Sequence, residues 1–454
     1  MNWSSKEAAI VSNGTSFSSW EGGKLVFDSR LIEKGDIFIA LPGATADGHD
    51  FIKTAFENGA SGAIASRIPE GINKDKILLV EDSIKALSAM ATYKRKKSKA
   101  KFIAITGSVG KTSTKELLGL ALSSHGKTFV SRGNYNNFLG VPINLASMPD
   151  DTEYAVIEIG MDHAGEITPL SDLVKPNLAM ITAIENIHRA NFDSIEGIAE
   201  AKAEIFHGMS SGIAIINSLS NCHELLKERA APMKTYSLGI DSKITSYEVL
   251  NNNTRAELNI LGQDISLKLD NIMGRHQIHN MMATLTSIAA LGLDPLKSVN
   301  ALEQFKLPRG RGLVSKINID GKNITIIDDS YNAGPVSVKA ALKNMSYYTG
   351  RKIAILGDMT EMGPESIKLH TGLSEDIIAN NIDKVICFGN IMRNLYDALP
   401  ENKKLGHYIT LKDLGKDLPN KLEDGDILLI KGSLYLTNLY GFTKHLIDNT
   451  LKLL

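Results

Sequence analysis

The fold of this chain is decided by Phe102-Ile-Ala-Ile-Thr-Gly-Ser-Val-Gly-Lys-Thr-Ser-Thr-Lys-Glu116. Residues 102–105 are apolar and rich in β-branched side chains, which is typical of a buried strand. A glycine-containing loop follows, and then a run of helix formers from Lys115 to Leu122. A strand, a glycine loop and a helix start, in this order, bring backbone N–H groups and a helix N-terminus onto a phosphate chain. The stretch therefore predicts a nucleotide-phosphate site.

The spacing of this loop differs from the usual G-x-x-x-x-G-K-[ST] pattern, because Ile105 stands where the first glycine is expected. The loop reads T-G-x-x-G-K-T, a shorter variant. In this interpretation Lys111 reaches the outer phosphates and the hydroxyl of Thr112 holds Mg²⁺. The alternative is a structural glycine turn with a surface lysine, which the flanking strand and helix disfavour.

The bulk composition is that of an ordinary globular protein. The chain has 454 residues, 43% hydrophobic and 22% charged, and its formal net charge is −1, so charge gives no reason to expect nucleic acid or membrane partners. Two cysteines, Cys222 and Cys387, cannot form a disulfide framework and fit a reducing compartment. We see no N-terminal signal and no apolar run long enough to span a bilayer. We therefore expect a cytoplasmic protein without a membrane span.

The order of apolar and helical segments predicts an α/β chain of three domains. We expect a small N-terminal α/β domain at residues 1–83, a central ATP-binding domain with a mostly parallel sheet at 84–306, and a Rossmann-like domain at 307–454. The last lacks a G-x-G-x-x-G loop, which argues against NAD. Predicted strands lie at 24–30, 36–41, 62–65, 102–105, 155–159, 178–184, 213–216, 323–328, 352–356, 384–388 and 427–430, an antiparallel insert lies at 234–270, and predicted helices lie at 51–59, 276–291, 335–348, 365–380 and 434–447.

Polar residues just after the strands of the central domain are the first candidates for chemistry, because ligands bind at the carboxyl ends of parallel strands. Glu158 could hold Mg²⁺ or could cap a helix. His188 is an unusual partner for Mg²⁺, which prefers oxygen, so its spacing alone favours a loop histidine. Lys202, taken alone, would be a solvated helix lysine.

Similar strand-end loops occur in the last domain. Asp328 and Asp329 either cap a helix or contact ribose and substrate, and the spacing leaves these alternatives open. Leu356-Gly-Asp-Met-Thr-Glu-Met-Gly363 is a comparable loop, with His370 in the helix that follows. Arg309 and Arg311, in a glycine-rich linker, either stabilise phosphate charge or keep the linker solvated.

Several runs together resemble the Mur ligases of peptidoglycan synthesis, and the resemblance covers essentially the whole chain. They are Thr106–Thr112, Gly133-Asn-Tyr-Asn-Asn-Phe-Leu-Gly-Val-Pro142, Glu158-Ile-Gly-Met, Gly165-Glu-Ile, Asp328-Asp-Ser-Tyr-Asn-Ala, the 356–363 loop, and Asp28-Ser-Arg30, Gly35-Asp36 and Asp47-Gly-His49 near the N-terminus. Within the family the chain is most similar to the member that adds D-alanyl-D-alanine to UDP-N-acetylmuramoyl-tripeptide.

This resemblance implies a chemistry. ATP phosphorylates the carboxylate that ends the tripeptide, the amine of the dipeptide attacks the acyl phosphate, and an amide, ADP and phosphate are released. A carboxylate is a poor acyl donor until one oxygen becomes a good leaving group, so this order of steps is physically sensible. The implied partners are the two substrates, with ATP and Mg²⁺, and we expect a monomer.

The resemblance also implies roles for single residues. ATP would be bound by Thr106, Gly107, Ser108, Val109, Gly110, Lys111, Thr112 and Ser113, with Asn280 on adenine, Arg309 or Arg311 on the phosphates and Asp329 on the ribose. Metal would be bound by Thr112, Glu158, His188 and Lys202, the last matching the lysine that the family carbamylates, and Lys111, Glu158, His188 and Lys202 would be catalytic. Ser29 and Arg30 would hold the uridine diphosphate, and Asn137, Tyr331 and Asn332 would contact substrate.

Two departures from the family pattern stand out. After the third strand of the central domain the chain reads His188-Arg-Ala-Asn-Phe-Asp-Ser194, which places Arg189 near the expected metal site. After Lys431-Gly-Ser433 comes Leu434-Tyr-Leu-Thr-Asn438 in place of a more basic stretch, which leaves the dipeptide contacts open. A folylpolyglutamate-type ligase is disfavoured by the motifs at 134–142 and 328–333. A nucleotide-dependent switch would not need Glu158, His188 and Lys202.

Overall fold

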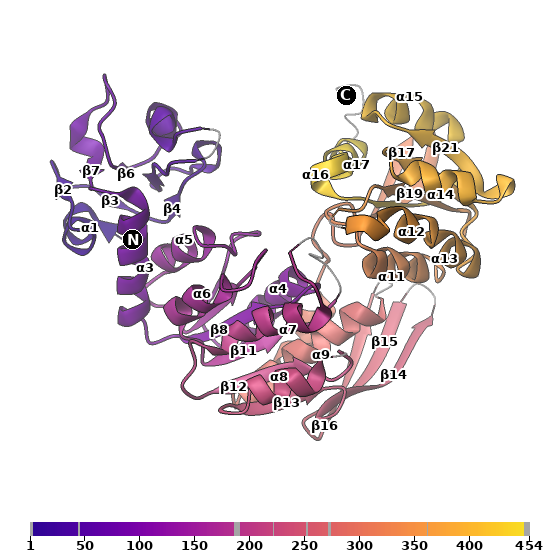
Figure 1. Ribbon diagram of the computed structural model, residues 1–454, viewed down its shortest axis with the longest axis horizontal. Coiled ribbons are helices and arrows are strands. Elements are labelled where there is room, and N and C mark those ends of the chain that lie inside the picture. The colour runs from indigo at the N-terminus through magenta and orange to yellow at the C-terminus, as the bar shows by residue number, and fades with distance from the viewer. Residues whose placement is uncertain are drawn as a thin grey trace. The chain divides into compact units, whose positions relative to one another are not determined.

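The structure is a computed structural model that describes residues 3–43, 46–185, 191–220, 222–250, 253–270, 274–360 and 362–448. Figure 1 shows the course of the chain, coloured by residue number. The chain divides into two compact units. The first comprises Met1–Ile184, Glu196–Ile240 and Ser287–Ser298, and the second comprises Glu185–Ile195, Asp241–Thr286 and Val299–Leu454. Each contains helices and strands, so the α/β class that the sequence predicted is confirmed, and each unit is described by itself below.

The first unit begins with a small sheet in the order β2-β7-β6-β5-β4. Its strands are β2 (Thr15–Ser16), β4 (Leu25–Val26), β5 (Ile37–Ile39), β6 (Gly62–Ala65) and β7 (Ile77–Leu79), all parallel except β2, and β1 (Trp3–Ser4) pairs with β3 (Glu21–Gly22). Helix α2 (Ile52–Glu57) covers one face with Ile52 and Ala55. The strand predicted at 24–30 is shorter than expected, because Asp28 caps a 3-10 turn at Ser29–Leu31.

The same unit contains a run of parallel strands in the order β13-β12-β11-β8-β10-β9. They are β8 (Lys101–Thr106), β9 (Thr128–Val130), β10 (Tyr154–Glu158), β11 (Leu178–Ile181), β12 (Ile213–Asn217) and β13 (Lys234–Leu238). The sequence did not predict β9, and it wrongly placed β13 in the antiparallel insert, because a single alternating segment does not reveal which neighbour it pairs with.

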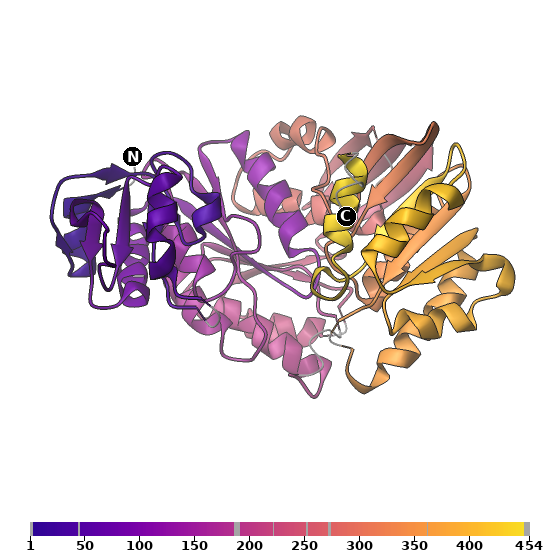
Figure 2. The ribbon, with the colours of Figure 1, turned by 90° about the horizontal axis from the view of Figure 1, so that it is seen from above.

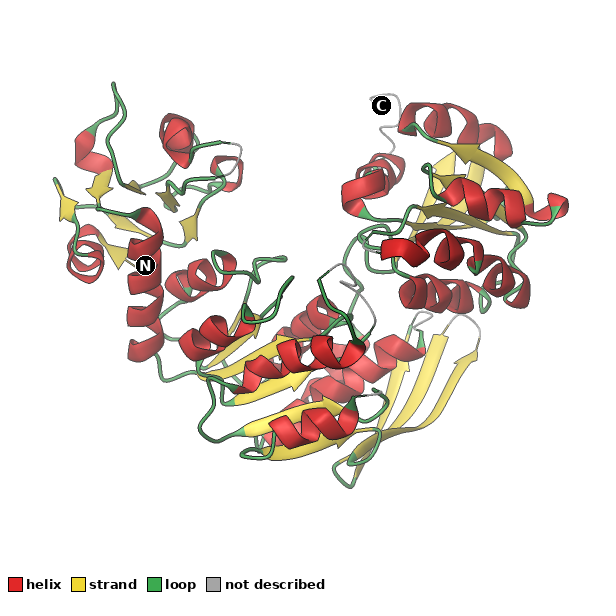
Figure 3. Ribbon diagram, in the orientation of Figure 1, coloured by secondary structure: helices red, strands yellow, loops and turns green. Residues whose placement is uncertain are grey.

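Helices alternate with these strands (Figure 3). They are α3 (Ser83–Lys97), α4 (Lys111–Ser123), α5 (Gly140–Ser147), α6 (Ile167–Val174), α7 (Ile195–Ala203) and α8 (His223–Arg229), with α1 (Ser5–Ser12) packing on α3. Helix α4 contacts β8, β9 and β10 and buries Leu117, Leu118 and Leu122. This packing fixes the start of α4 at the carboxyl end of β8, where the glycine loop lies.

The second unit begins with an antiparallel arrangement of β14 (Ser242–Leu250), β15 (Asn253–Ile260) and β16 (Gln263–Leu269). Buried and exposed residues alternate along β15 and β16, which is the pattern of a sheet with one solvated face. Helices α9 (Arg275–Ala290) and α10 (Leu296–Glu303) follow in the chain, with Ser287–Ser298 belonging to the first unit, and the predicted helix at 276–291 is confirmed.

The rest of the second unit is a sheet in the order β17-β18-β22-β19-β20-β21, parallel except for β17. Its strands are β17 (Leu313–Ile319), β18 (Lys322–Asp328), β19 (Lys352–Gly357), β20 (Lys384–Phe388), β21 (Lys404–Tyr408) and β22 (Ile427–Lys431). The strands predicted at 323–328, 352–356, 384–388 and 427–430 are confirmed, whereas β17 and β21 were not predicted, because their half-buried patterns lack continuous apolar runs.

Helices cover both faces of this sheet (Figure 2). Side chains of α11 (Pro335–Met345), α13 (Leu373–Ala379) and α14 (Met392–Ala398) pack on one face, and those of α15 (Leu411–Lys421) and α17 (Leu439–Ile447) pack on the other. Two long predicted helices are interrupted: α12 (Ser366–Thr371) is separated from α13 at Gly372, and α16 (Leu434–Thr437) from α17 at Asn438, which is left-handed. Within the described residues no helix is long and apolar enough to cross a membrane.

Candidate functional site

The glycine loop connects β8 to α4 in the conformation that a phosphate cradle requires. Gly107 has φ +148° and Gly110 has φ +84°, so both occupy backbone regions that side chains disfavour. Gly110 is the residue before the first turn of α4, whose N–H groups are therefore directed at the loop. Lys111 Nζ lies 2.5 Å from the carbonyl oxygen of Gly107. The lysine thus closes over the loop in which phosphates would lie.

Thr182, just after β11, braces this loop and was not found by sequence reasoning. Its Oγ1 donates to the carbonyl oxygen of Val109 at 2.6 Å, and its N–H donates to Thr106 at 3.0 Å. A Cβ on Gly107 would come within 2.0 Å of Thr182 Oγ1. The residue that follows β11 therefore favours glycine at position 107, the first glycine of the loop.

Glu158 lies beside the loop because β10 and β8 pair in parallel with Glu158 opposite Ile105, directly before Thr106. The carboxylate is 2% exposed. Its Oε1 accepts a hydrogen bond from Asn136 Nδ2 at 2.8 Å, while Oε2 has no hydrogen-bond partner within the described chain. Glu158 does not cap a helix; it is a buried carboxylate with an open acceptor.

In the Asn-rich run at 133–142 the neighbouring residues Asn136 and Asn137 make different contacts, which the sequence did not distinguish. Asn136 contacts Glu158, and its own carbonyl oxygen accepts from Gly160 at 2.8 Å. Asn137 instead turns its Oδ1 toward the start of α5, where it accepts from Leu139 and Gly140. The role of Asn137 as a substrate contact stays a prediction: its described hydrogen bonds lie at the start of α5, and Asn136 is the residue that contacts Glu158.

Lys202, on α7, is not a solvated helix lysine. It is 1% exposed, and burial holds its pKa well below the ordinary value. The charge of Lys111 lowers the pKa of Lys202 further, and the carboxylate of Asp162 acts in the opposite direction. A lowered pKa increases the share of the neutral amine, which is the nucleophilic form of lysine. His188 and Arg189 lie outside the described residues.

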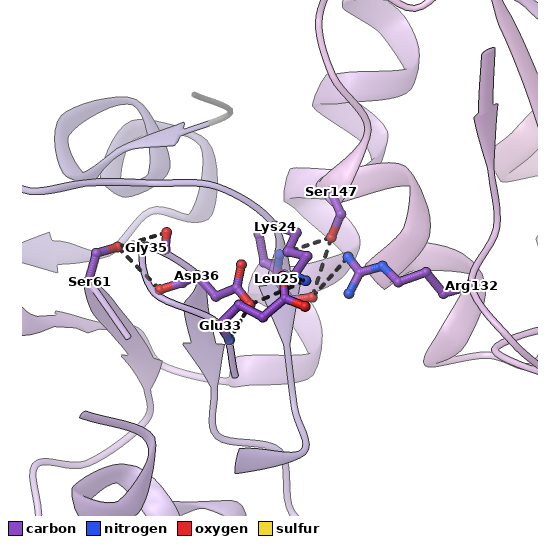
Figure 4. A network of polar contacts seen from close by, with 8 residues as sticks. All are labelled: Lys24, Leu25, Glu33, Gly35, Asp36, Ser61, Arg132 and Ser147. Carbon is purple, nitrogen blue, oxygen red and sulfur yellow. Dashed lines mark hydrogen bonds and ion pairs between the residues drawn. The ribbon is translucent and has the colours of Figure 1, made fainter. Parts of the chain in front are cut away.

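The N-terminal sheet is joined to this part of the first unit through Leu25 (Figure 4). The Leu25 N–H donates to Ser147 Oγ at 2.9 Å, and its carbonyl oxygen accepts from Arg132 Nη2 at 3.4 Å. On the sheet side, Lys24 pairs with Glu33 at 2.6 Å. Arg132 directly precedes the Asn-rich run, so the same run is anchored to the N-terminal sheet and to Glu158.

Ser29 and Arg30 lie in the 3-10 turn after β4. Arg30 makes two hydrogen bonds to the carboxylate of Asp28, Nε to Oδ1 at 2.9 Å and Nη2 to Oδ2 at 2.7 Å, and these lower the pKa of Asp28. Ser29 is buried, whereas the Arg30 side chain is largely exposed. The ring of Phe27 lies 5.0 Å from that of Tyr135, so this turn adjoins the Asn-rich run.

In the second unit the two aspartates at the end of β18 have different roles, and neither is the residue that precedes α11, which is Gly334, whose N–H donates to Ser337 Oγ. Asp328 is 1% exposed and accepts from Gly310 N–H at 2.9 Å and Ser330 Oγ at 2.5 Å. Burial raises the pKa of Asp328. Asp328 therefore fixes the backbone of the preceding segment at Gly310.

Asp329 is the aspartate that stays partly accessible. Its Oδ2 accepts from Lys431 Nζ at 2.6 Å, and the same ammonium donates to the carbonyl oxygen of Asn332 at 3.0 Å. Lys431 ends β22, which pairs in parallel with β18, so the neighbouring strand supplies the cation. Sequence reasoning did not assign this role to Lys431, because the contact depends on strand order.

The remaining candidates of the second unit have the following contacts. The Arg311 guanidinium lies 4.2 Å from the ring centroid of Tyr331, while Arg309 pairs with Asp448 at 2.9 Å. Asn332 Oδ1 accepts from the N–H of Ala333. Asn280 lies on α9 and is half-buried. Arg309 and Arg311 thus each have a protein partner in addition to any phosphate.

The 356–363 loop is held by buried groups. Asp358 accepts from Met392 N–H at 2.7 Å at the start of α14. His370 Nε2 accepts from Met359 N–H at 2.9 Å, and its Nδ1 lies 2.7 Å from the carbonyl oxygen of Ser366. Asp358 and His370 therefore shape the loop. Three or more His, Cys, Asp or Glu side chains do not gather into a metal-binding group anywhere in the described ranges.

Comparison with known families gives matches over most of the chain. The Mur ligase family catalytic domain matches residues 24–95, the Mur ligase middle domain matches 105–288, and the Mur ligase glutamate ligase domain matches 314–434. The middle-domain match begins at the end of β8 and includes the glycine loop, Glu158 and Lys202.

Individual relatives agree with these matches. The chain is 42% identical to the UDP-N-acetylmuramoyl-tripeptide–D-alanyl-D-alanine ligase of Rickettsia prowazekii, over 95% of this chain and 97% of the relative. It is 32% identical to the ligase of the same name from Bacillus subtilis, over 89% of each chain. Among solved structures, MurF of Acinetobacter baumannii superimposes with a TM-score of 0.83 at 30% identity, covering 98% of this chain and 99% of that one. MurF of Thermotoga maritima in complex with ADP gives a TM-score of 0.76 at 27% identity, covering 95% and 98%.

Proposed function

Because this chain belongs to the Mur ligase family, we propose that it uses ATP to join D-alanyl-D-alanine to the carboxylate of UDP-N-acetylmuramoyl-tripeptide. It is a ligase of peptidoglycan precursor synthesis, and relatives with this name match nearly its full length. The observation that carries the proposal is the joint presence of the glycine loop, Glu158 and Lys202 in the first unit.

The glycine loop and the first turn of α4 would bind the ATP phosphates through backbone N–H groups, from Thr106 to Ser113. Lys111, which now lies on the Gly107 carbonyl, would turn to the outer phosphate. Its positive charge would stabilise the charge that develops as the carboxylate attacks phosphorus, a contribution that is often roughly 3–4 kcal/mol for a preorganised group. The product of this step is an acyl phosphate and ADP.

Residues of the first unit fit a Mg²⁺ ion. Glu158 is a carboxylate with an acceptor oxygen that no described group satisfies, and oxygen is the ligand that Mg²⁺ prefers. We assign Thr112 and Glu158 as its ligands, with His188 and Lys202 serving a second ion. Bound Mg²⁺ would neutralise phosphate charge during transfer.

Lys202 would act as a carbamate. Its lowered pKa favours the neutral amine that reacts with CO₂, and the carbamate would place a negative charge where a bare ammonium would face Lys111. Burial excludes water from this group, which protects the carbamate from exchange.

The remaining assignments concern the substrates and the arrangement of the protein. We assign Ser29 and Arg30 to the uridine diphosphate, Asp329 to the ribose and Asn280 to adenine, with Arg309 or Arg311 on the phosphates and Asn137, Tyr331 and Asn332 on substrate. We also propose three domains at 1–83, 84–306 and 307–454, a monomer, and a cytoplasmic location, which the two buried free cysteines support.

The test is an assay of phosphate release from ATP. Release is expected to require both UDP-N-acetylmuramoyl-tripeptide and D-alanyl-D-alanine, and omission of either substrate is the control. Parallel assays with meso-diaminopimelate and with lysine as the third residue would identify the preferred tripeptide. Release that neither substrate changes would contradict the ligase proposal and favour a nucleotide-dependent switch.

A further inference from the structure

Lys115 is a fully buried lysine with no part in the reaction described above. It lies on α4 one turn after Lys111, and its Nζ lies 2.8 Å from the carbonyl oxygen of Gly133 and 3.1 Å from Glu116 Oε1. Glu158 Oε2 lies 3.8 Å away. An ammonium group without access to water is retained only where neighbouring groups compensate for its lost hydration. The site of Lys115 therefore depends on the Asn-rich run and on Glu158.

The carboxylate of Glu158 is held from two sides. Asn136 donates to Oε1, and Lys115 faces Oε2 at a distance that allows Coulombic attraction but no hydrogen bond. Gly133, which Lys115 anchors, is three residues before Asn136 and has φ +47°. Lys115 thus acts on Glu158 directly through charge and indirectly through the backbone that carries Asn136.

We propose that Lys115 is a positioning residue that holds Glu158 and the Gly133–Asn136 backbone in the geometry required for the divalent cation of ATP. This proposal rests on the proposed function, in which Glu158 is a ligand of that cation. The ammonium of Lys115 is directed to Gly133, Glu116 and Glu158, so the proposal gives it no direct contact with phosphate or metal.

Two physical effects of Lys115 have opposite signs. Its positive charge repels a cation near Glu158, so charge alone predicts that neutralising Lys115 tightens metal binding. Its ordering of the ligand predicts the reverse, since groups that orient a metal ligand typically contribute roughly 10- to 100-fold to metal affinity. We expect the ordering of Glu158 to outweigh the repulsion. Weaker metal binding in a Lys115 variant would support ordering, and tighter binding would support repulsion.

The experiment measures Mn²⁺ affinity by electron paramagnetic resonance with saturating ADP, a readout that needs no turnover. Lys115→Met is expected to weaken Mn²⁺ binding roughly 10-fold or more. Lys115→Gln is expected to lose less, because its amide can still donate to the Gly133 carbonyl. Lys127→Met is the matched control. Lys127 also pairs with a carboxylate, Asp151 at 2.5 Å, but it is exposed and is assigned no part in the cation site. The Mn²⁺ affinity of this variant should equal that of the wild type. In steady-state assays the KM for Mg²⁺ should rise while the KM for D-alanyl-D-alanine stays unchanged.

A fourth variant separates the two proposals. Glu158→Gln should weaken Mn²⁺ binding in any case if Glu158 is a ligand. Should Glu158→Gln weaken binding while Lys115→Met leaves it unchanged or tightens it, the positioning role is wrong and the cation assignment survives. If Glu158→Gln has no effect, the cation assignment itself fails. Circular dichroism checks folding, and if Lys115→Met does not fold, Lys115→Gln gives the decisive affinity.

Discussion

Lys431 Nζ lies 2.6 Å from Asp329 Oδ2, although the two residues are 102 positions apart in the chain. Lys431 ends β22 and is 3% exposed, and Asp329 follows β18, the strand beside β22. The pair places a cation next to the carboxylate that we assign to the ATP ribose. Asp329 is thereby kept in one orientation, with 22% of its side chain accessible.

Replacing Lys431 by Met is expected to destabilise the protein by about 1–3 kcal/mol, because it leaves Asp329 without its cation in a largely buried place. Partial exposure of Asp329 keeps the cost below that of a fully buried pair. The midpoint of urea unfolding measures the loss, and the KM for ATP should rise in parallel. The double variant Lys431→Met/Asp329→Asn should recover part of the stability; a double variant less stable than Lys431→Met would argue against the pair.

Gly107→Ala is expected to abolish ADP binding, because the new Cβ would meet Thr182 Oγ1 at 2.0 Å on a backbone with φ +148°. Titration calorimetry with ADP gives the affinity. Gly71→Ala is the matched control: Gly71 also has positive φ, +75°, but its Cβ would have nothing within 4 Å. That variant should bind ADP normally, and equal loss in both would show that backbone strain, not the contact with Thr182, is responsible.

Lys202→Ala is expected to lose most activity and to regain part of it with short carboxylic acids, which would supply the carboxylate group of the carbamate in the space that the lysine side chain leaves. Phosphate release with and without acetate measures the rescue, and Lys227→Ala, a lysine on α8, serves as the control. Wild-type activity in Lys202→Ala would exclude the carbamate role. Depletion of CO₂ from the buffer should lower wild-type activity and leave the variant unchanged.

The protein is expected to lose stability as the pH falls from about 6.5 to about 4, and His279 contributes to this loss. Burial lowers the pKa of His279 to about 4, from an ordinary value near 6.5, and the charges of Arg275 and His276 act in the same direction. Between these values the unfolded chain binds a proton that the folded chain does not, so stability decreases with falling pH. Above pH 6.5 the imidazole of His279 is neutral in both the folded and the unfolded chain, so its contribution to the pH dependence of stability vanishes.

His279→Gln tests this pH dependence. The variant should show a smaller decrease in unfolding midpoint between pH 6.5 and 4 than the wild type, measured by urea titration at each pH. His445→Gln, a histidine in the last turn of α17, is the control and should follow the wild type. Parallel curves for the wild type and His279→Gln would show that this histidine does not carry the shifted pKa.

Much of the fold was accessible from apolar periodicity. The strands with continuous apolar runs, such as β8, β20 and β22, were predicted within a residue or two. Short or half-buried strands were missed, because their pairing partners, and not their own patterns, make them strands. The breaks at Gly372 and Asn438 were missed because each interrupts an otherwise helical run at a single residue.

The site divides in the same way. Local sequence determined the glycine loop, since a strand, two glycines, Lys111 and a helix start act over ten consecutive residues and need only backbone geometry. Only the tertiary structure decided that Asn136 rather than Asn137 faces Glu158, that Asp328 is structural while Asp329 is paired, and that Lys115 is buried. These contacts depend on which strands are neighbours and on which side chains are removed from water. Both are set by long-range packing, which the spacing of residues along the chain does not reveal.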